Sequence, residues 1–256
     1  MIIELTYPIH EGMFKYPSDP EPKINIIPAT TKEEIDGGWS EGENRPLFGS
    51  ILIKYKSGYS EVAIRNHHGT HIDAPAHKLP DGKKISDYPL KRFRNVCTLL
   101  KVPSKRIITL DDIAPLDLSK HQSPGLILYT GFCDEMEKEE RKLTGQAKTD
   151  FEKKFPALSQ ETAEYLIKMN PNLSLLGIDS FSFDPQGSNS EAHRVFLKKD
   201  ILLLETLVNL SELKRIAGEN KFMLYSAPIP YHNADASQTR AFAITDEPGG
   251  RNELSS

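Results

Sequence analysis

Five short apolar runs, each bounded by turn-forming residues, place the strongest limit on what this chain can fold into. Runs of this kind are typical of strands buried inside a sheet. A Ser-capped amphipathic segment at 159–171 and a Ser-capped, Gly-terminated one at 211–218 predict helices between them. We therefore expect an α/β fold: a single domain over residues 1–256, with a mixed β-sheet or barrel-like β core flanked by a few helices. The five runs are VCTLLKV, GLILYT, LSLLGID, ILLLETL and KFMLYSAPI.

Other segments carry weaker signals. IIEL near the start predicts a short strand, and the proline-rich YPSDPEP predicts a loop. SILIKY and YSEVAIRN, with Gly58 between them, predict a hairpin or two adjacent strands. Residues 134–155 are charged on all sides with little apolar periodicity, which favours a solvated helix or an insertion.

Composition excludes several classes of protein. The net charge of −4 and the scattered basic residues argue against nucleic acid or an anionic membrane surface as a partner. The best apolar run is interrupted by Glu205 and is too short to span a membrane. No signal peptide is evident at the start. Cys97 and Cys133 lie in strand-like apolar contexts and are expected to be reduced core residues, so we expect a cytoplasmic location.

Four of the eight histidines fall within one stretch, NHHGTHIDAPAH, at residues 66–77. His67 and His71 have the i, i+4 spacing of a zinc-peptidase helix of the HExxH type. That interpretation fails because no Glu follows the first His, and because Gly69 and Pro75 disfavour a helix here. A strand end that opens into a loop is the better prediction.

If residues 67–77 are extended, three histidines and one aspartate lie on the same face, because alternate residues of a strand point the same way. Three imidazoles and a carboxylate suit Zn²⁺, Mn²⁺ or Fe²⁺. Glycine within this face leaves room for a bound ion or substrate. The alternative is a set of surface or capping histidines. The residues that share the face are His67, Gly69, His71, Asp73, Pro75 and His77.

The same stretch resembles the signature H-x-G-T-H-x-D-x-P-x-H of the metal-dependent cyclase-like hydrolases, a family that includes bacterial kynurenine formamidase and isatin hydrolase. Further segments resemble the family from the first strand to the last: ELTYPIHEGMFKYPSDP, GIDSFSFDP, EAHRVFLKKDILLLETLVNL and NADASQTRAF. The resemblance implies the family's cyclase-like fold, of the swivelling β/β/α type. It also implies a homodimer or a higher homo-oligomer.

Position by position, the resemblance implies that His67, His71 and Asp73 bind one divalent metal ion, zinc or manganese. In members with two ions, Asp73 bridges them, and His193 with Glu205 holds the second. Glu205 also has support from the residues alone, because a lone carboxylate in an apolar run is costly to bury unless it is paired or metal-bound. A Glu that faces a lid or joins a salt bridge is the alternative. His193 alone is compatible with an ordinary histidine at a helix start.

The implied chemistry is hydrolysis of a C–N bond by metal-activated water. The metal brings the pKa of its bound water towards neutrality, and His77, by implication the general acid/base, passes a proton to the leaving group. A third histidine that completes a one-ion site is the alternative for His77. The expected substrate is an aryl formamide or a cyclic amide, with Tyr16, Trp39 and Phe181 as candidate apolar contacts. A plain core or interface position is the alternative for each of the three.

The resemblance has departures, and they keep other functions open. Phe181 and Gln238 stand where family members carry proline, and residues 27–50 and 134–155 are extra segments of the kind that rebuild substrate pockets. One alternative is a cyclase or lactone hydrolase that acts on a small polyketide-like molecule. Another is a non-catalytic metal- or ligand-binding protein, although such a protein has no need of the proton carrier His77.

Overall fold

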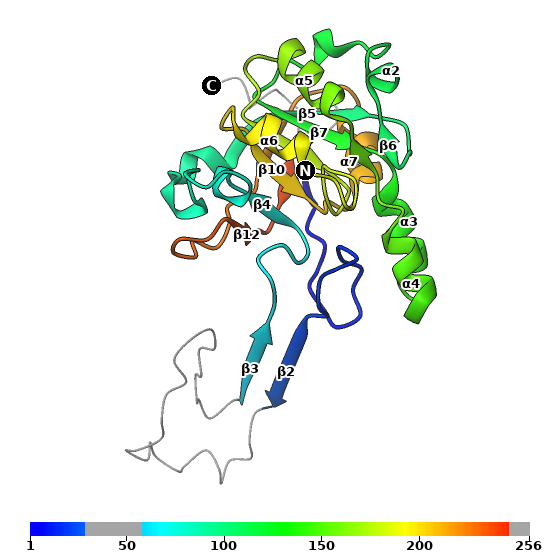
Figure 1. The fold of residues 1–256 in the computed structure, drawn as a ribbon, viewed down its shortest axis with the longest axis vertical. Coiled ribbons are helices and arrows are strands. Elements are labelled where there is room, and N and C mark those ends of the chain that lie inside the picture. Colours follow the sequence, from blue (N-terminus) through cyan, green and yellow to red (C-terminus); the bar gives the residue numbers. More distant parts are fainter. Residues whose placement is uncertain (29–57, 246–256) are drawn as a thin grey trace. The chain divides into compact units, whose positions relative to one another are not determined.

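The apolar runs form the middle of one mixed sheet (Figure 1). The computed structural model describes residues 1–28 and 58–245, and in this part of the chain nine strands make up the sheet. This confirms the α/β fold with a mixed sheet that the sequence predicts. In sheet order the strands are β1 (Ile2–Glu4), β13 (Phe242–Ile244), β11 (Phe222–Tyr225), β5 (Arg94–Lys101), β7 (Gly125–Tyr129), β9 (Leu175–Ile178), β10 (Leu202–Glu205), β4 (His71–Asp73) and β12 (Ala236–Gln238).

Four parallel strands, β5, β7, β9 and β10, form the centre of this sheet. Antiparallel strands flank the centre on both sides, with β11, β13 and β1 beyond β5, and β4 and β12 beyond β10. Three of these strands, β7, β9 and β10, are apolar at almost every position because both of their faces are buried. The histidine-rich stretch enters the sheet as β4, directly beside β10.

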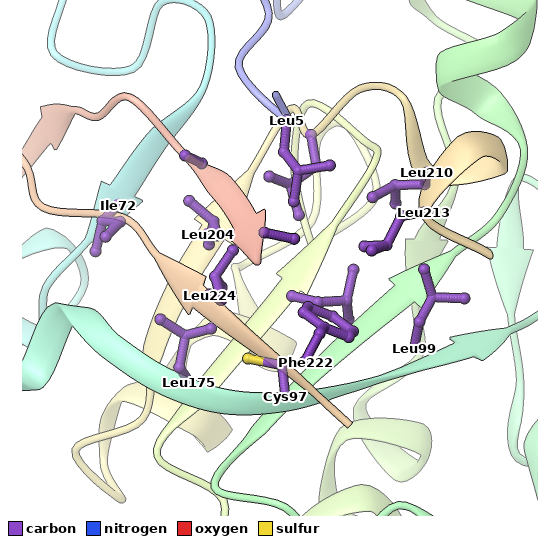
Figure 2. Close-up of a cluster of buried hydrophobic side chains, with 14 of the residues drawn as sticks. Leu5, Ile72, Cys97, Leu99, Leu175, Leu204, Leu210, Leu213, Phe222 and Leu224 are labelled. Atoms are coloured by element: carbon purple, nitrogen blue, oxygen red, sulfur yellow. The ribbon is translucent and has the colours of Figure 1, made fainter. Parts of the chain in front are cut away.

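The two faces of the sheet pack against different helices. On β10, Leu202 and Leu204 belong to one apolar cluster, and Leu203 between them belongs to the other. The first cluster includes Leu210 and Leu213 of the helix α7 and is shown in Figure 2. The second cluster includes residues of α5 and α6 on the opposite face. The face covered by α5 and α6 is the one that carries the candidate site.

The helices lie mostly where the sequence predicts them. Ser159 caps α5 by accepting a hydrogen bond from the backbone N–H of Thr162, as expected. The prediction of a serine cap on α7 is wrong, because the helix begins at Leu210 after Asn209; its glycine end at Gly218 is confirmed. The α-helices are α2 (Leu110–Ile113), α3 (Phe132–Glu139), α4 (Gly145–Glu152), α5 (Gln160–Met169), α6 (Glu191–Leu197) and α7 (Leu210–Ala217). The 3₁₀ helices are Pro75–His77, Ile85–Asp87, Leu90–Phe93 and Leu118–Lys120, and β6 (Ile107–Ile108) pairs with β8 (Ala157–Leu158).

The charged segment 134–155 differs from its prediction. It forms most of α3 and all of α4, and these helices are not solvated on all sides, because Met136, Phe151 and Glu152 are buried. Phe151 packs against Phe132 and Phe14, with ring centroids 5.3 and 4.7 Å away. Single apolar residues spread over two short helices give no periodic pattern, which is why the sequence did not reveal this buried face.

The described residues cluster into two compact units. The larger unit joins Met1–Pro8, Phe14–Pro17 and the chain from Asn66 onward, and it contains the nine-stranded sheet. In the smaller unit β2 (Lys23–Pro28) pairs in antiparallel register with β3 (Gly58–Ala63). The strand predicted at residues 50–55 lies outside the described residues. The single domain over 1–256 stays a prediction.

Two further properties of the described chain bear on its class. Cys97 and Cys133 are buried free thiols, as the sequence predicts. Among residues 1–28 and 58–245, we find no helix with both the length and the apolar character that crossing a bilayer requires.

Candidate metal centre and active site

Strands β4 and β10 supply the floor of the candidate site. Their antiparallel register sets His71 opposite Glu205, and Ile72 turns to the apolar cluster on the other face. Strand alternation therefore points His71 and Asp73 towards the face of Glu205. Asp73 is 0% exposed and Glu205 is also buried. The lone carboxylate in the apolar run is thus buried and paired, with Glu205 Oε2 3.2 Å from His71 Nε2.

Turns at the two ends of β4 bring in two more histidines. The prediction of an extended chain over 67–77 is wrong outside His71–Asp73, because residues 66–70 form turns and Pro75–His77 is a 3₁₀ helix. The predicted convergence nevertheless occurs. His67 Nδ1 lies 3.0 Å from Asp73 Oδ1, and His77 Nε2 lies 3.7 Å from Asp73 Oδ2.

Gly69 belongs to the first of these turns. Its φ is +65°, a left-handed conformation that glycine adopts without steric cost. Its carbonyl oxygen accepts a hydrogen bond from His71 Nδ1 at 2.9 Å. The turn therefore orients the His71 ring.

Helix α6 packs on the same face of the sheet and contributes His193. His193 Nε2 lies 3.3 Å from Asp73 Oδ2 and 3.2 Å from Glu205 Oε1. Its other ring nitrogen, Nδ1, donates a hydrogen bond to Asp184. Asp184 also accepts the backbone N–H groups of Ala192 and His193, so it fixes both the start of α6 and the ring. Sequence reasoning missed Asp184, although it lies only nine residues before His193.

The arrangement of ring nitrogens requires a cation. The Gly69 carbonyl and the Asp184 carboxylate only accept hydrogen bonds, so Nδ1 of both His71 and His193 carries a proton. In a neutral imidazole the remaining Nε2 is then a lone-pair acceptor, and it faces carboxylate oxygens that are also acceptors. Buried Nε2 of His71 and both oxygens of Asp73 make no hydrogen bond within the protein. Acceptors that converge in this way are stable only around protons or a metal ion.

Without a metal, protons take the place of the cation. Burial alone lowers the pKa of His67, but the charge of Asp73 and the hydrogen bond to Asp235 raise it to about 10. The pKa of His193 is also raised well above its usual value, because the carboxylates of Asp184, Asp73 and Glu205 outweigh its burial. Burial raises the pKa of Asp73, but the surrounding histidines together hold it well below its usual range.

The donor set suits a transition-metal ion. Imidazole nitrogens and carboxylate oxygens are the ligands of zinc, manganese and ferrous iron. Glu205 belongs to none of the three-residue groups given below; its two oxygens contact His71 and His193 separately. Among the described residues, three overlapping groups have ligand atoms within 4.8 Å of one another: His67, His71 and Asp73; Asp73, His77 and His193; and His67, His77 and Asp235.

Asp235 is the second residue of the site that sequence reasoning missed. It immediately precedes β12, the edge strand that pairs with β4. Its Oδ2 accepts hydrogen bonds from His77 Nδ1 at 2.9 Å and from His67 Nε2 at 3.3 Å. The only sequence signal was the resemblance of NADASQTRAF to a family segment, which assigned no role to this aspartate.

The three residues named as candidate substrate contacts have different outcomes. Tyr16 is half-buried, with its ring 5.5 Å from that of Phe155. Phe181 is 5% exposed and packs in the same aromatic cluster, 6.1 Å from Phe155 and 5.3 Å from Phe132, which leaves little of it for a substrate. Trp39 lies outside the described residues.

Gly82 supports the turn that carries His77. A Cβ atom at this position would lie 2.4 Å from the backbone C of Pro75 and 2.5 Å from the backbone N of Ala76. We expect Gly82→Ala to displace the segment Pro75–His77, to destabilise the fold by about 1–3 kcal/mol, and to lower any turnover that depends on His77. Denaturant unfolding and kcat measure the two effects. Wild-type stability and kcat in Gly82→Ala would contradict the prediction.

Comparison with known proteins agrees with this geometry. Residues 3–185 match the family model described as "Putative cyclase". A kynurenine formamidase of Geobacillus thermodenitrificans is 28% identical over 219 residues, which cover 85% of this chain and 90% of the relative. A solved structure described as a potential metal-dependent hydrolase with cyclase activity has a TM-score of 0.65 at 23% identity, covering 97% of this chain and 99% of the other. An isatin hydrolase bound to the product analogue thioisatinate has a TM-score of 0.67 at 14% identity, covering 95% and 92%. At these identities the two structures show a shared fold.

Proposed function

Because the chain belongs to the cyclase family, we propose that it is a metal-dependent hydrolase that cleaves the C–N bond of an aryl formamide or a cyclic amide. The observation that carries this proposal is the convergence of acceptor nitrogens and carboxylate oxygens on one buried point beside a more exposed histidine. The names of a kynurenine formamidase relative and an isatin hydrolase neighbour support the substrate class.

His67, His71 and Asp73 would hold one divalent ion, zinc or manganese, and Asp73 with His193 and Glu205 would hold a second where two are bound. When bound, the metal supplies a water that is acidic enough to give hydroxide near neutral pH. Asp73, His71, His193 and Glu205 are all buried, which shields this point from bulk solvent.

His77 would serve as the general acid/base. Its side chain is 18% exposed and that of His67 is 26% exposed, against 1% for His71 and 3% for His193, so His77 and His67 lie where the buried centre opens to solvent. Its Nε2 faces Asp73 and is free to take a proton from the attacking water and pass it to the leaving nitrogen. A leaving amide nitrogen needs this proton because an amine anion is a very poor leaving group.

The test is a screen of the purified protein, with its metal content measured first. An aryl formamide, an isatin and an aryl lactone are each assayed with native protein, with chelator-treated protein, and after readdition of zinc or manganese. We expect metal-dependent turnover of the formamide or the isatin. Turnover of the lactone alone would point to C–O hydrolysis, and a metal-bound protein that turns over none of the three would point to the non-catalytic alternative.

A cytoplasmic location and a homodimer belong to the same proposal. The two buried free thiols support a reducing compartment. The family resemblance supports the dimer, and sedimentation analysis of the full chain tests it.

Metal uptake is expected to release protons. With a pKa of about 10, His67 is protonated at pH 7.5 in the metal-free protein, and His193, whose pKa is also raised, is protonated as well. Metal ligation needs neutral imidazoles, so binding displaces these protons. Calorimetric titration with zinc in two buffers of different ionisation enthalpy measures the release. Equal heats in the two buffers would contradict the prediction.

The same shift has a consequence for stability. His67 has a raised pKa in the folded state, so its contribution to the stability of the metal-free protein is fully present below about pH 6.5 and is lost as the pH rises through about 10. The metal-loaded protein lacks this dependence at His67, because the metal and not a proton then holds the ring.

A further inference from the structure

Asp235 is held against the segment that carries the candidate general acid/base. Its backbone carbonyl oxygen accepts a hydrogen bond from Ala74 N at 2.9 Å, immediately between Asp73 and Pro75. The following strand, β12, continues this attachment by pairing with β4, where Ala236 lies opposite Asp73. The backbone of Asp235 is therefore fixed relative to the metal centre although its side chain is 38% exposed.

One oxygen of Asp235 contacts two histidines with different proposed roles. Oδ2 accepts from His77 Nδ1 at 2.9 Å and from His67 Nε2 at 3.3 Å. A carboxylate can only accept, so the proton of the neutral His77 ring must lie on Nδ1. Nε2 of His77 is then the basic nitrogen, and it points at the centre, 3.7 Å from Asp73 Oδ2.

We infer that Asp235 is a positioning residue for His77: it holds the tautomer and ring orientation in which Nε2 can exchange a proton with the reacting groups. This inference rests on the proposed function, which assigns the acid/base role to His77. The same carboxylate oxygen orients His67 through the nitrogen that does not face Asp73, as outer partners of metal-binding histidines commonly do. Asp235 thereby fixes the distance and angle between a metal ligand and the proton carrier.

A competing role is direct metal binding, since ligand atoms of His67, His77 and Asp235 also lie within 4.8 Å of one another. The two roles predict different results for Asp235→Ala. If Asp235 is a positioning residue, Asp235→Ala still binds the wild-type amount of metal at saturating zinc and lowers kcat by roughly 10–100-fold, with little change in KM. A metal ligand lowers the metal content.

The kinetic test is a double-mutant cycle on the metal-loaded full chain. If Asp235 acts through His77, Asp235→Ala lowers kcat in the wild type and has a much smaller effect in a His77→Ala background, where only its contact with His67 remains. Asp235→Asn should recover part of the loss, because one amide oxygen can accept from both rings. Asp150→Ala is the control, since Asp150 is exposed on α4 and contacts Gln146 and Lys153. An equal loss in both backgrounds, or a loss of bound metal, would overturn the inference.

A second readout does not need a substrate. In zinc-loaded protein labelled with ¹⁵N-histidine, long-range ¹H–¹⁵N spectra report which ring nitrogen of His77 carries the proton, with His77→Ala used for assignment. We expect the Nδ1–H form in the wild type and an increase of the Nε2–H form in Asp235→Ala. An unchanged tautomer in Asp235→Ala would overturn the positioning role. This measurement does not depend on turnover. A failed substrate screen would therefore refute the proposed function, whereas the spectra would still show whether Asp235 sets the His77 tautomer.

Discussion

Asp73→Asn is expected to give a folded protein that binds no stoichiometric metal and has no detectable hydrolase activity. Asp73 is the only described side chain whose oxygens face four histidine rings: His67 at 3.0 Å, His71 at 3.4 Å, His193 at 3.3 Å and His77 at 3.7 Å. Asparagine keeps the volume but removes the negative charge that brings a cation to this buried point. The loss should exceed the roughly 10–100-fold that a change beside the ligands costs.

Elemental analysis, circular dichroism and the substrate screen together check this result. Asp184→Asn is the matched comparison, because Asp184 contacts the outer ring nitrogen of His193 and belongs to none of the candidate metal-binding groups among the described residues. We expect Asp184→Asn to weaken metal binding and activity partially, and Asp73→Asn to remove both. Wild-type metal content and activity in Asp73→Asn would show that Asp73 is not a metal ligand, and the proposed metal centre would then be wrong.

The parts of this site that could be predicted from sequence are those encoded locally. His67, His71, Asp73 and His77 occur within eleven residues, and their spacing is informative even though the backbone between them is not the uniform strand that was expected. Glu205 was recognisable for a different reason, because a single charge inside a buried apolar strand needs a partner.

The parts that could not be predicted depend on the order of strands. Asp235 is 158 residues from His77 in the chain, and it reaches the site only because β12 pairs with β4 at the edge of the sheet. Nothing in the local sequence encodes that pairing. Gly82 is a similar case. Only glycine fits at this position, because the backbone of Pro75 and Ala76 passes too close to leave room for a Cβ atom.

The apolar pattern was a good guide to the sheet and a poor one to helices α3 and α4. Central strands bury both faces, so their signal is a continuous run that charged residues seldom interrupt. In α3 and α4 a few apolar side chains, such as Met136 and Phe151, are separated by charged ones. A helix is correctly predicted there, but its buried stripe is not, because burial of one narrow stripe leaves the composition of the segment almost unchanged.

His77→Ala should retain its metal and lose turnover by about 10²–10⁴-fold, the usual value of positioned proton transfer. The structure separates His77 from the other histidines. Its Nε2 is 3.7 Å from the nearest Asp73 oxygen, further than the ring nitrogens of His67, His71 and His193, and its Nδ1 is engaged by Asp235. The His77 side chain is 18% exposed, more than His71 and His193 although less than His67 at 26%, which suits a group that must meet a substrate.

The leaving group of the substrate makes this prediction specific. If His77 delivers the proton, the loss in His77→Ala should be largest for an unactivated aryl formamide and much smaller for one whose nitro-substituted ring stabilises the departing nitrogen. A histidine that only completes the metal site would give equal losses for the two substrates, together with lower metal content. His232→Ala, an exposed histidine of the loop before β12, is the matched control and should leave both rates unchanged. An unchanged kcat in His77→Ala with the unactivated aryl formamide would exclude His77 from proton transfer.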